Sequence, residues 1–114
     1  MKKYLLLIAL ITFSFSFSQI ETPQPSPAAE IDQIVGLTEM HIEYSRPSMR
    51  GREIFGNLVP YNKIWRTGAN ASTKISFSTN VEINGQMVAA GQYSIFTVPN
   101  ESEWEFILYS DTSV

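Results

Sequence analysis

The segment TKISFSTNVEINGQMVAAGQYSIFTVP, residues 73–99, decides the fold of this chain. Apolar and polar residues alternate at its start and again at residues 81–83, and a further apolar run fills residues 92–98. Alternation with period two is typical of β-strands that pack one face against a core. Asn84-Gly85 follows one of these runs, and both residues tolerate the positive φ of a tight hairpin turn. The segment therefore predicts successive antiparallel strands.

The residues on either side of this segment extend the pattern. Apolar and polar residues alternate from Thr38 to Ser45, which predicts a half-buried strand. Residues from Glu103 to Tyr109 predict a last strand, and its apolar side chains on both faces indicate that it is covered on both sides. The strands are short, glycine and proline turns join them, and no amphipathic helix is evident. We therefore predict an all-β, antiparallel domain that is sandwich-like or barrel-like.

The N-terminal part of the chain has the layout of a signal peptide. A short basic start at Met1-Lys2-Lys3 precedes an apolar run that ends at Phe17, and small residues flank that end. We expect residues 1–18 to be cleaved before Gln19 and the protein to be exported, to the periplasm or outside the cell. The apolar run, about 14 residues, is shorter than the roughly 20 that span a membrane, so we expect no stable insertion after cleavage.

The mature part divides into a linker and one domain. Residues 19–30 contain three prolines and no periodic apolar pattern, which is typical of an extended linker. The β-domain is expected over residues 31–114 and to be incomplete at its C-terminal end, because the chain stops soon after a strongly apolar strand. The chain has no cysteine, which excludes disulfides, thiol nucleophiles and thiolate metal sites.

Charge is distributed unevenly along the mature chain. Beyond residue 18 there are six basic and eleven acidic residues, a net charge of −5. Residues 46–66 hold five of these basic residues and one acidic residue, a net charge of +4, which leaves −9 for the rest. A basic segment in an acidic domain indicates either internal docking of the two parts or a pocket for an anion. The overall negative charge argues against a nucleic-acid partner.

The basic segment lies within a long basic and aromatic loop, RPSMRGREIFGNLVPYNKIWRTGANA, residues 46–71, which holds all four arginines. Its interleaved apolar residues indicate that it folds back over the sheet. In a structural interpretation the arginines are semi-buried, pair with carboxylates or loop carbonyls, and anchor the loop. In a functional interpretation Arg46, Arg52 and Arg66 form a pocket for a carboxylate, phosphate or sulfate.

The run WRTGAN, which begins at Trp65, also has two interpretations. Gly68 and Asn70 suit a left-handed backbone. Thr67, Asn70 and Ser72 then place hydroxyl and amide groups beside Trp65, as in a site for a saccharide or another small polar ligand. Alternatively the run is a structural turn whose side chains bond the loop backbone.

Metal binding and catalysis have weaker support in the sequence. Glu39, His41 and Glu43 alternate along one strand face, where chelation is geometrically possible, but a solvated face is the commoner outcome. One histidine cannot build a multi-histidine zinc site. No serine-nucleophile elbow, phosphate-binding glycine loop or zinc-protease helix motif is present, and His41 has no evident nucleophile partner. We expect no cofactor.

Three runs resemble one known family: residues 46–77, the run VEINGQMVAAGQYSIFTVP at 81–99, and WEFIL at 104–108. They closely resemble an uncharacterised family of exported bacterial proteins, domain of unknown function 2911, and the resemblance extends from about Ala28 to Tyr109. The family has no established activity, so the resemblance implies none. Its members usually continue past the last of these strands, which agrees with an incomplete domain here.

We therefore expect an exported β-domain that binds a small polar or anionic ligand through residues 46–71. The candidate binding residues are Arg46, Arg52, Trp65, Arg66, Thr67 and Asn70. This interpretation predicts a concave site beneath Trp65 lined by arginines. A structural domain, or one that docks another envelope protein, predicts paired arginines and no cavity. A hydrolase-like enzyme, which the missing motifs disfavour, requires an acid and a base converging on the same loop.

Overall fold

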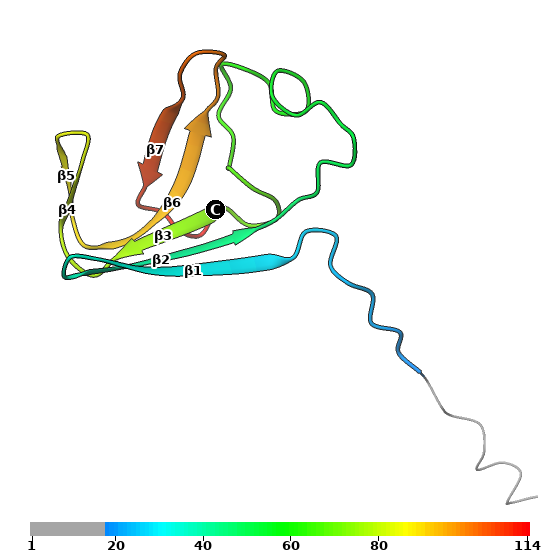
Figure 1. The fold of residues 1–114 in the computed structure, drawn as a ribbon, viewed down its shortest axis with the longest axis horizontal. Helices are drawn as coiled ribbons and strands as arrows, with labels where there is room; N and C mark the ends of the chain where they lie inside the picture. Colours follow the sequence, from blue (N-terminus) through cyan, green and yellow to red (C-terminus); the bar gives the residue numbers. More distant parts are fainter. Residues whose placement is uncertain (1–17) are drawn as a thin grey trace, which may run out of the picture.

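A computed structural model of the protein describes residues 18–114, which form antiparallel β-sheets without a helix (Figure 1). The expected signal peptide lies, apart from Ser18, outside the described residues. Within the described part of the chain, no helix has the length and apolar character that a membrane crossing requires. The prediction of an all-β antiparallel domain is confirmed.

The strands form a sheet of five and a sheet of two. The larger sheet has the order β1-β2-β3-β6-β7, with β1 (Ala28–Val35), β2 (Thr38–Ser45), β3 (Thr73–Phe77), β6 (Gly91–Val98) and β7 (Glu105–Tyr109). The smaller sheet consists of β4 (Val81–Ile83) and β5 (Gln86–Val88). Because β1 and β7 are both edges, the larger sheet is open, and the barrel-like alternative does not describe residues 18–114.

The predicted hairpin turn lies between β4 and β5. Asn84 and Gly85 have φ values of 49° and 79°, the left-handed backbone that a tight hairpin requires. Figure 1 shows this hairpin standing up from one end of the larger sheet. Val81, Ile83 and Val88 of the hairpin pack against the core of that sheet. The arrangement is thus sandwich-like, with a very small second layer.

The core lies on one face of the larger sheet. Ile75, Phe77 and Ile95 are buried there, on β3 and β6, and Phe77 is only 4% exposed. On the opposite face of the sheet, the C-terminal residues cover Ser94, which is fully buried. The Ser94 hydroxyl donates to the Asp111 carbonyl at 3.0 Å. The central strands β3 and β6 therefore hold the domain together.

The two edges of the sheet show features that the sequence did not predict. β1 begins at Ala28, within the segment expected to be a linker, because it pairs along its whole length with β2, from Ala28 opposite Ser45 to Val35 opposite Thr38. β7 is not covered on both faces by the described residues, since Phe106 is 52% exposed. Each of these strands pairs with only one neighbour, so its side chains are less covered than those of the central strands.

Candidate functional site

The long loop leaves the sheet after β2 and returns to it beside β6. The backbone N–H of Trp65 donates to the Thr97 carbonyl at 2.7 Å, and the N–H of Thr97 donates to the Trp65 carbonyl at 2.9 Å. β3 starts at Thr73 and pairs with β6 only as far as Ile95. Trp65 occupies the next position along β6, opposite Thr97. The prediction that the loop folds back onto the sheet is correct.

A tight turn presents two arginines from the first half of the loop. The N–H of Arg52 donates to the Met49 carbonyl at 3.0 Å, which closes a turn around Arg50 and Gly51. Both central residues have positive φ, 52° and 69°, as in the turns that usually need glycine or asparagine. Arg50 therefore holds a backbone conformation that is uncommon for its residue type, at a point where its side chain is exposed.

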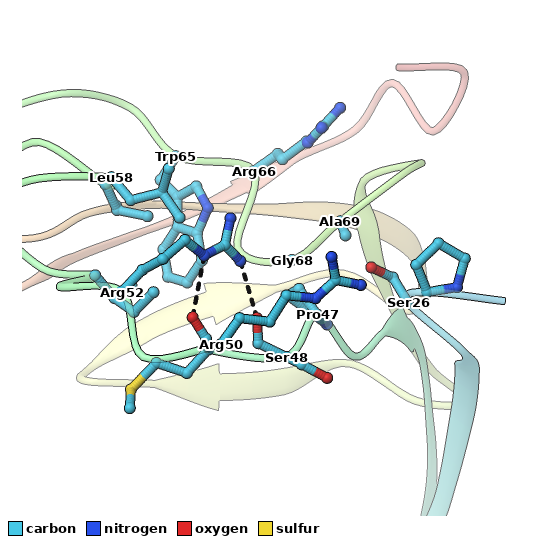
Figure 2. Close-up of a pocket in the computed structure, with 14 residues that line it drawn as sticks. Ser26, Pro47, Ser48, Arg50, Arg52, Leu58, Trp65, Arg66, Gly68 and Ala69 are labelled. Atoms are coloured by element: carbon cyan, nitrogen blue, oxygen red, sulfur yellow. Dashed lines mark hydrogen bonds between the residues drawn. The ribbon is translucent and has the colours of Figure 1, made fainter.

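The side chain of Arg52 is fixed by carbonyls of the same turn. Its Nε donates to the Met49 carbonyl at 3.0 Å and its Nη2 to the Ser48 carbonyl at 2.9 Å (Figure 2). A guanidinium has five N–H donors, so these two bonds orient the group and leave donors for another acceptor. The structural interpretation was correct for Arg52 in naming loop carbonyls as its partners.

These arginines line a cleft of about 650 Å³ between the loop and the segment before β1. Its lining residues are Pro25, Ser26, Pro47, Ser48, Met49, Arg50, Arg52, Ile54, Leu58, Val59, Trp65, Arg66, Gly68 and Ala69. The lining therefore includes three arginines and no aspartate or glutamate. In Figure 2 the Arg50 side chain extends toward Ser26, and Arg66 points away from the other two arginines. The cleft is cationic, with Arg66 at its rim.

The arginines are not the semi-buried anchors that we predicted. All four are exposed, and within residues 18–114 none of them forms an ion pair with a carboxylate. Internal docking of the basic loop onto the acidic domain through ion pairs is therefore not what the described residues show. The reason is that the loop joins the sheet through the backbone pairing of Trp65 with Thr97, so its cations remain in solvent.

Three predicted site residues lie outside the cleft. Arg46 turns back onto β2, where its Nε donates to the Tyr44 hydroxyl at 2.9 Å and its guanidinium carbon lies 5.4 Å from the ring centroid. The Thr67 hydroxyl lies 2.9 Å from the Thr97 hydroxyl. The Asn70 amide donates weakly to the Ser45 hydroxyl and to a carbonyl of the N-terminal segment, at 3.4 and 3.5 Å. The Thr67 hydroxyl also donates to the Trp65 carbonyl at 3.2 Å, a bond to the loop backbone of the kind that the structural interpretation of the WRTGAN run expected.

The backbone of that run is strained next to the cleft. Thr67 has φ of 60°, which is unusual for a β-branched residue and costs on the order of 1–3 kcal/mol. Its carbonyl accepts a bond of 2.7 Å from the Thr73 hydroxyl, which holds the conformation. Gly68 follows with φ of 155°, and a Cβ there would lie 3.1 Å from the Thr73 hydroxyl oxygen. The close packing explains why this position carries glycine.

An aromatic cluster supports the cleft from behind Trp65. Phe55, Trp65 and Trp104 contact one another edge to face, with ring centroids 4.9 to 6.1 Å apart. The cluster joins the loop to the residue just before β7, so Trp65 is fixed by its side chain as well as by its backbone.

Arg50 is the cleft arginine that sequence reasoning missed. It was counted in the basic segment, but only Arg46, Arg52 and Arg66 were assigned to a pocket. The signal that points to it is the dipeptide Arg50-Gly51, because glycine after a polar residue marks a tight turn and a turn displays its central side chains.

Comparison with known families identifies the family of this chain. The family model described as Protein of unknown function (DUF2911) matches residues 26–114, which include every strand and all of the cleft lining except Pro25. The chain belongs to the DUF2911 family. Searches of the curated proteins and of the solved structures found no match to this chain.

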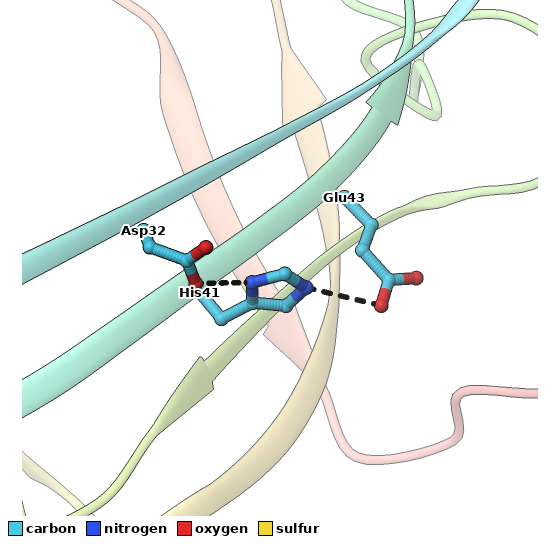
Figure 3. A network of polar contacts seen from close by, with 3 residues as sticks. All are labelled: Asp32, His41 and Glu43. Carbon is cyan, nitrogen blue, oxygen red and sulfur yellow. Dashed lines mark hydrogen bonds and ion pairs between the residues drawn. The ribbon is translucent and has the colours of Figure 1, made fainter.

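Outside the cleft, the DUF2911 domain has one cluster of titratable groups, on β1 and β2 (Figure 3). His41 Nδ1 lies 2.6 Å from an Asp32 carboxylate oxygen, and His41 Nε2 lies 3.2 Å from a Glu43 oxygen. Asp32 is paired with His41 across the strands, a partner that was not foreseen, whereas Glu39 does not join the cluster. In residues 18–114 no three acidic, histidine or cysteine side chains are arranged to hold a metal ion.

Raising the pH is expected to destabilise the DUF2911 domain through His41. Hydrogen bonds to Asp32 and then Glu43 raise the pKa of His41 above its ordinary value of 6.5. The protonated form is therefore favoured in the folded state, and its stabilisation is complete below about pH 6.5 and lost as the pH rises through the folded-state pKa. Melting temperatures measured from pH 5 to 9 should fall across this window in the natural protein and stay flat across it in His41→Gln. An equal fall in both proteins would contradict the assignment.

Proposed function

We propose that the cleft binds a small anionic ligand through Arg50 and Arg52, with Arg66 contributing at the rim. The observation that carries this proposal is that three arginines line one cleft whose lining residues include no carboxylate. Carboxylate, phosphate and sulfate are the matching chemistries, because a guanidinium donates two parallel hydrogen bonds to such groups.

The electrostatics of the domain support this choice. Arg50 and Arg52 line the cleft without a carboxylate among the other lining residues, so their positive charge favours a bound anion. The chain beyond residue 18 carries a total net charge of −5, so a general attraction for polyanions does not explain why arginines line this cleft. Arg52 is already oriented by the Ser48 and Met49 carbonyls, which lowers the entropy lost on binding.

The other candidate functions have less support. A saccharide site relied on polar side chains of Thr67, Asn70 and Ser72, and none of the three lines the cleft. A purely structural or partner-docking domain predicted paired arginines and no cavity, in contrast to the exposed arginines and the cleft. A hydrolase-like enzyme needs an acid and a base at the loop, and the cleft lining contains neither a carboxylate nor a histidine.

The proposal is tested by anion-dependent thermal stability. At constant ionic strength, replacing chloride by phosphate should raise the melting temperature of the natural protein, because a ligand that binds only the folded state stabilises it. Arg66→Met should unfold at the same temperature in chloride, since Arg66 is exposed, and should gain less from phosphate. A variant that loses stability in chloride and keeps the full gain in phosphate would show that Arg66 is structural. No gain in either protein would overturn the anion site.

Export is proposed on separate grounds. The basic start and apolar run of residues 1–18 support delivery of the mature domain to the periplasm or the exterior, where its partner would be a small anion or another envelope component. The mass of the mature protein recovered from its native host should correspond to a chain that begins at Gln19.

A further inference from the structure

The cleft has an apolar part that its charge does not explain. Besides the arginines, its lining includes Met49, Ile54, Leu58, Val59 and Trp65. Met49 is 61% exposed and Leu58 is 52% exposed, so two large apolar side chains of the lining lie largely in water. Exposed apolar side chains that gather at a concave site are typical of a surface that a ligand covers.

The apolar part is built into the fold of the loop. The N–H of Val59 donates to the Ile54 carbonyl at 2.8 Å, and the N–H of Gly56 donates to the Val59 carbonyl at 2.9 Å. Val59 itself is buried, so the turn that carries Leu58 is tied to the domain. Leu58 is therefore held at the cleft by hydrogen bonds and by a buried neighbour.

The size of the cleft also exceeds what a simple anion requires. Pockets for small organic ligands have volumes of roughly 300–1,000 Å³, and this cleft, at about 650 Å³, is in that range. A single phosphate bound between Arg50 and Arg52 would fill a small part of it. The remaining space is bordered by Leu58, Val59 and Trp65, which offer no charge and only the indole N–H as a polar group.

We infer that the ligand of this cleft is an anion with an apolar body, such as an aryl or alkyl phosphate or carboxylate. Its anionic group contacts Arg50 and Arg52, and its hydrocarbon part covers Leu58 and Trp65. The inference rests on the proposed anion site and adds the second half of the ligand. It also explains why apolar and cationic side chains line the same cleft.

The test compares three probes by NMR titration of the natural protein: inorganic phosphate, phenyl phosphate and neutral phenol. Phenyl phosphate is expected to bind roughly tenfold more tightly than phosphate, from the apolar area that one ring buries, and phenol is expected not to saturate. Leu58→Asn should bind phosphate as before and lose most of the preference for phenyl phosphate. Ile64→Asn is the matched control, because Ile64 is an exposed apolar residue of the same loop that does not line the cleft.

Each outcome decides between the two proposals. Equal affinity for phosphate and phenyl phosphate would overturn the apolar body and leave the anion site standing. A preference for phenyl phosphate that Leu58→Asn retains, or that Ile64→Asn loses, would overturn the assigned position of the ring. Failure of both phosphate and phenyl phosphate to bind would overturn the anion site itself.

Discussion

Arg52→Gln is expected to weaken phosphate binding roughly 10- to 100-fold, the effect of losing a hydrogen-bonded charge at about 1.5–3 kcal/mol. Arg52 is the one cleft arginine whose guanidinium is held by two carbonyls, so it presents its remaining donors in a fixed orientation. Isothermal titration calorimetry with phosphate at low ionic strength measures the change directly.

The matched control for this change is Arg46→Gln. Arg46 belongs to the same loop and is equally exposed, but it contacts Tyr44 and does not line the cleft. Its loss removes the same charge from the protein, so a general electrostatic attraction would fall equally in both variants. A dissociation constant that changes by the same factor in Arg46→Gln and Arg52→Gln would show that phosphate responds to net charge and not to the cleft.

Phe77→Ala is expected to destabilise the domain by about 3–5 kcal/mol, the usual cost of removing a buried phenyl ring. Phe77 is the least exposed apolar side chain of the core and lies on a central strand. The total stability of a domain is about 5–15 kcal/mol, so this variant should be close to unfolding at room temperature. Urea denaturation followed by circular dichroism gives the free energy of unfolding.

Phe106→Ala makes the same chemical change on the edge strand β7. Phe106 is about half exposed, so less apolar area returns to water and no closed cavity is left. We expect a loss below about 1.5 kcal/mol for this variant. If Phe106→Ala lowered the free energy of unfolding as much as Phe77→Ala or more, the assignment of the core to β3 and β6 would be wrong.

The sequence predicted the strands in which buried and exposed side chains alternate. It missed β1, whose side chains are almost all exposed. β2 has the predicted bounds of Thr38 and Ser45, because one of its faces packs on the core and imposes alternation. The turn at Asn84-Gly85 was predictable from its backbone chemistry alone. β1 has an exposed, irregular pattern and exists through its pairing with β2, which no local signal reports.

Part of the composition of the candidate site could be predicted from the sequence, but not which arginines line it. One of the two interpretations of the basic loop placed arginines and Trp65 at a concave site, and the cleft is lined by both residue types. Arg50 lines the cleft from a tight turn in which its φ is positive, whereas the Arg46 side chain lies against Tyr44 of β2. Side-chain direction in a long loop depends on such backbone angles, which composition and spacing do not specify.

The most direct test of the anion site is an NMR titration of the arginine side chains with phosphate. The chain has four arginines, so its spectrum should contain four Nε–Hε signals, each assignable by a single Arg→Lys variant. The Arg50 and Arg52 signals should shift along one saturable curve with a common dissociation constant, and the Arg46 signal should remain in place. Four signals that shift linearly and in parallel, without saturation, would show that phosphate does not bind in the cleft.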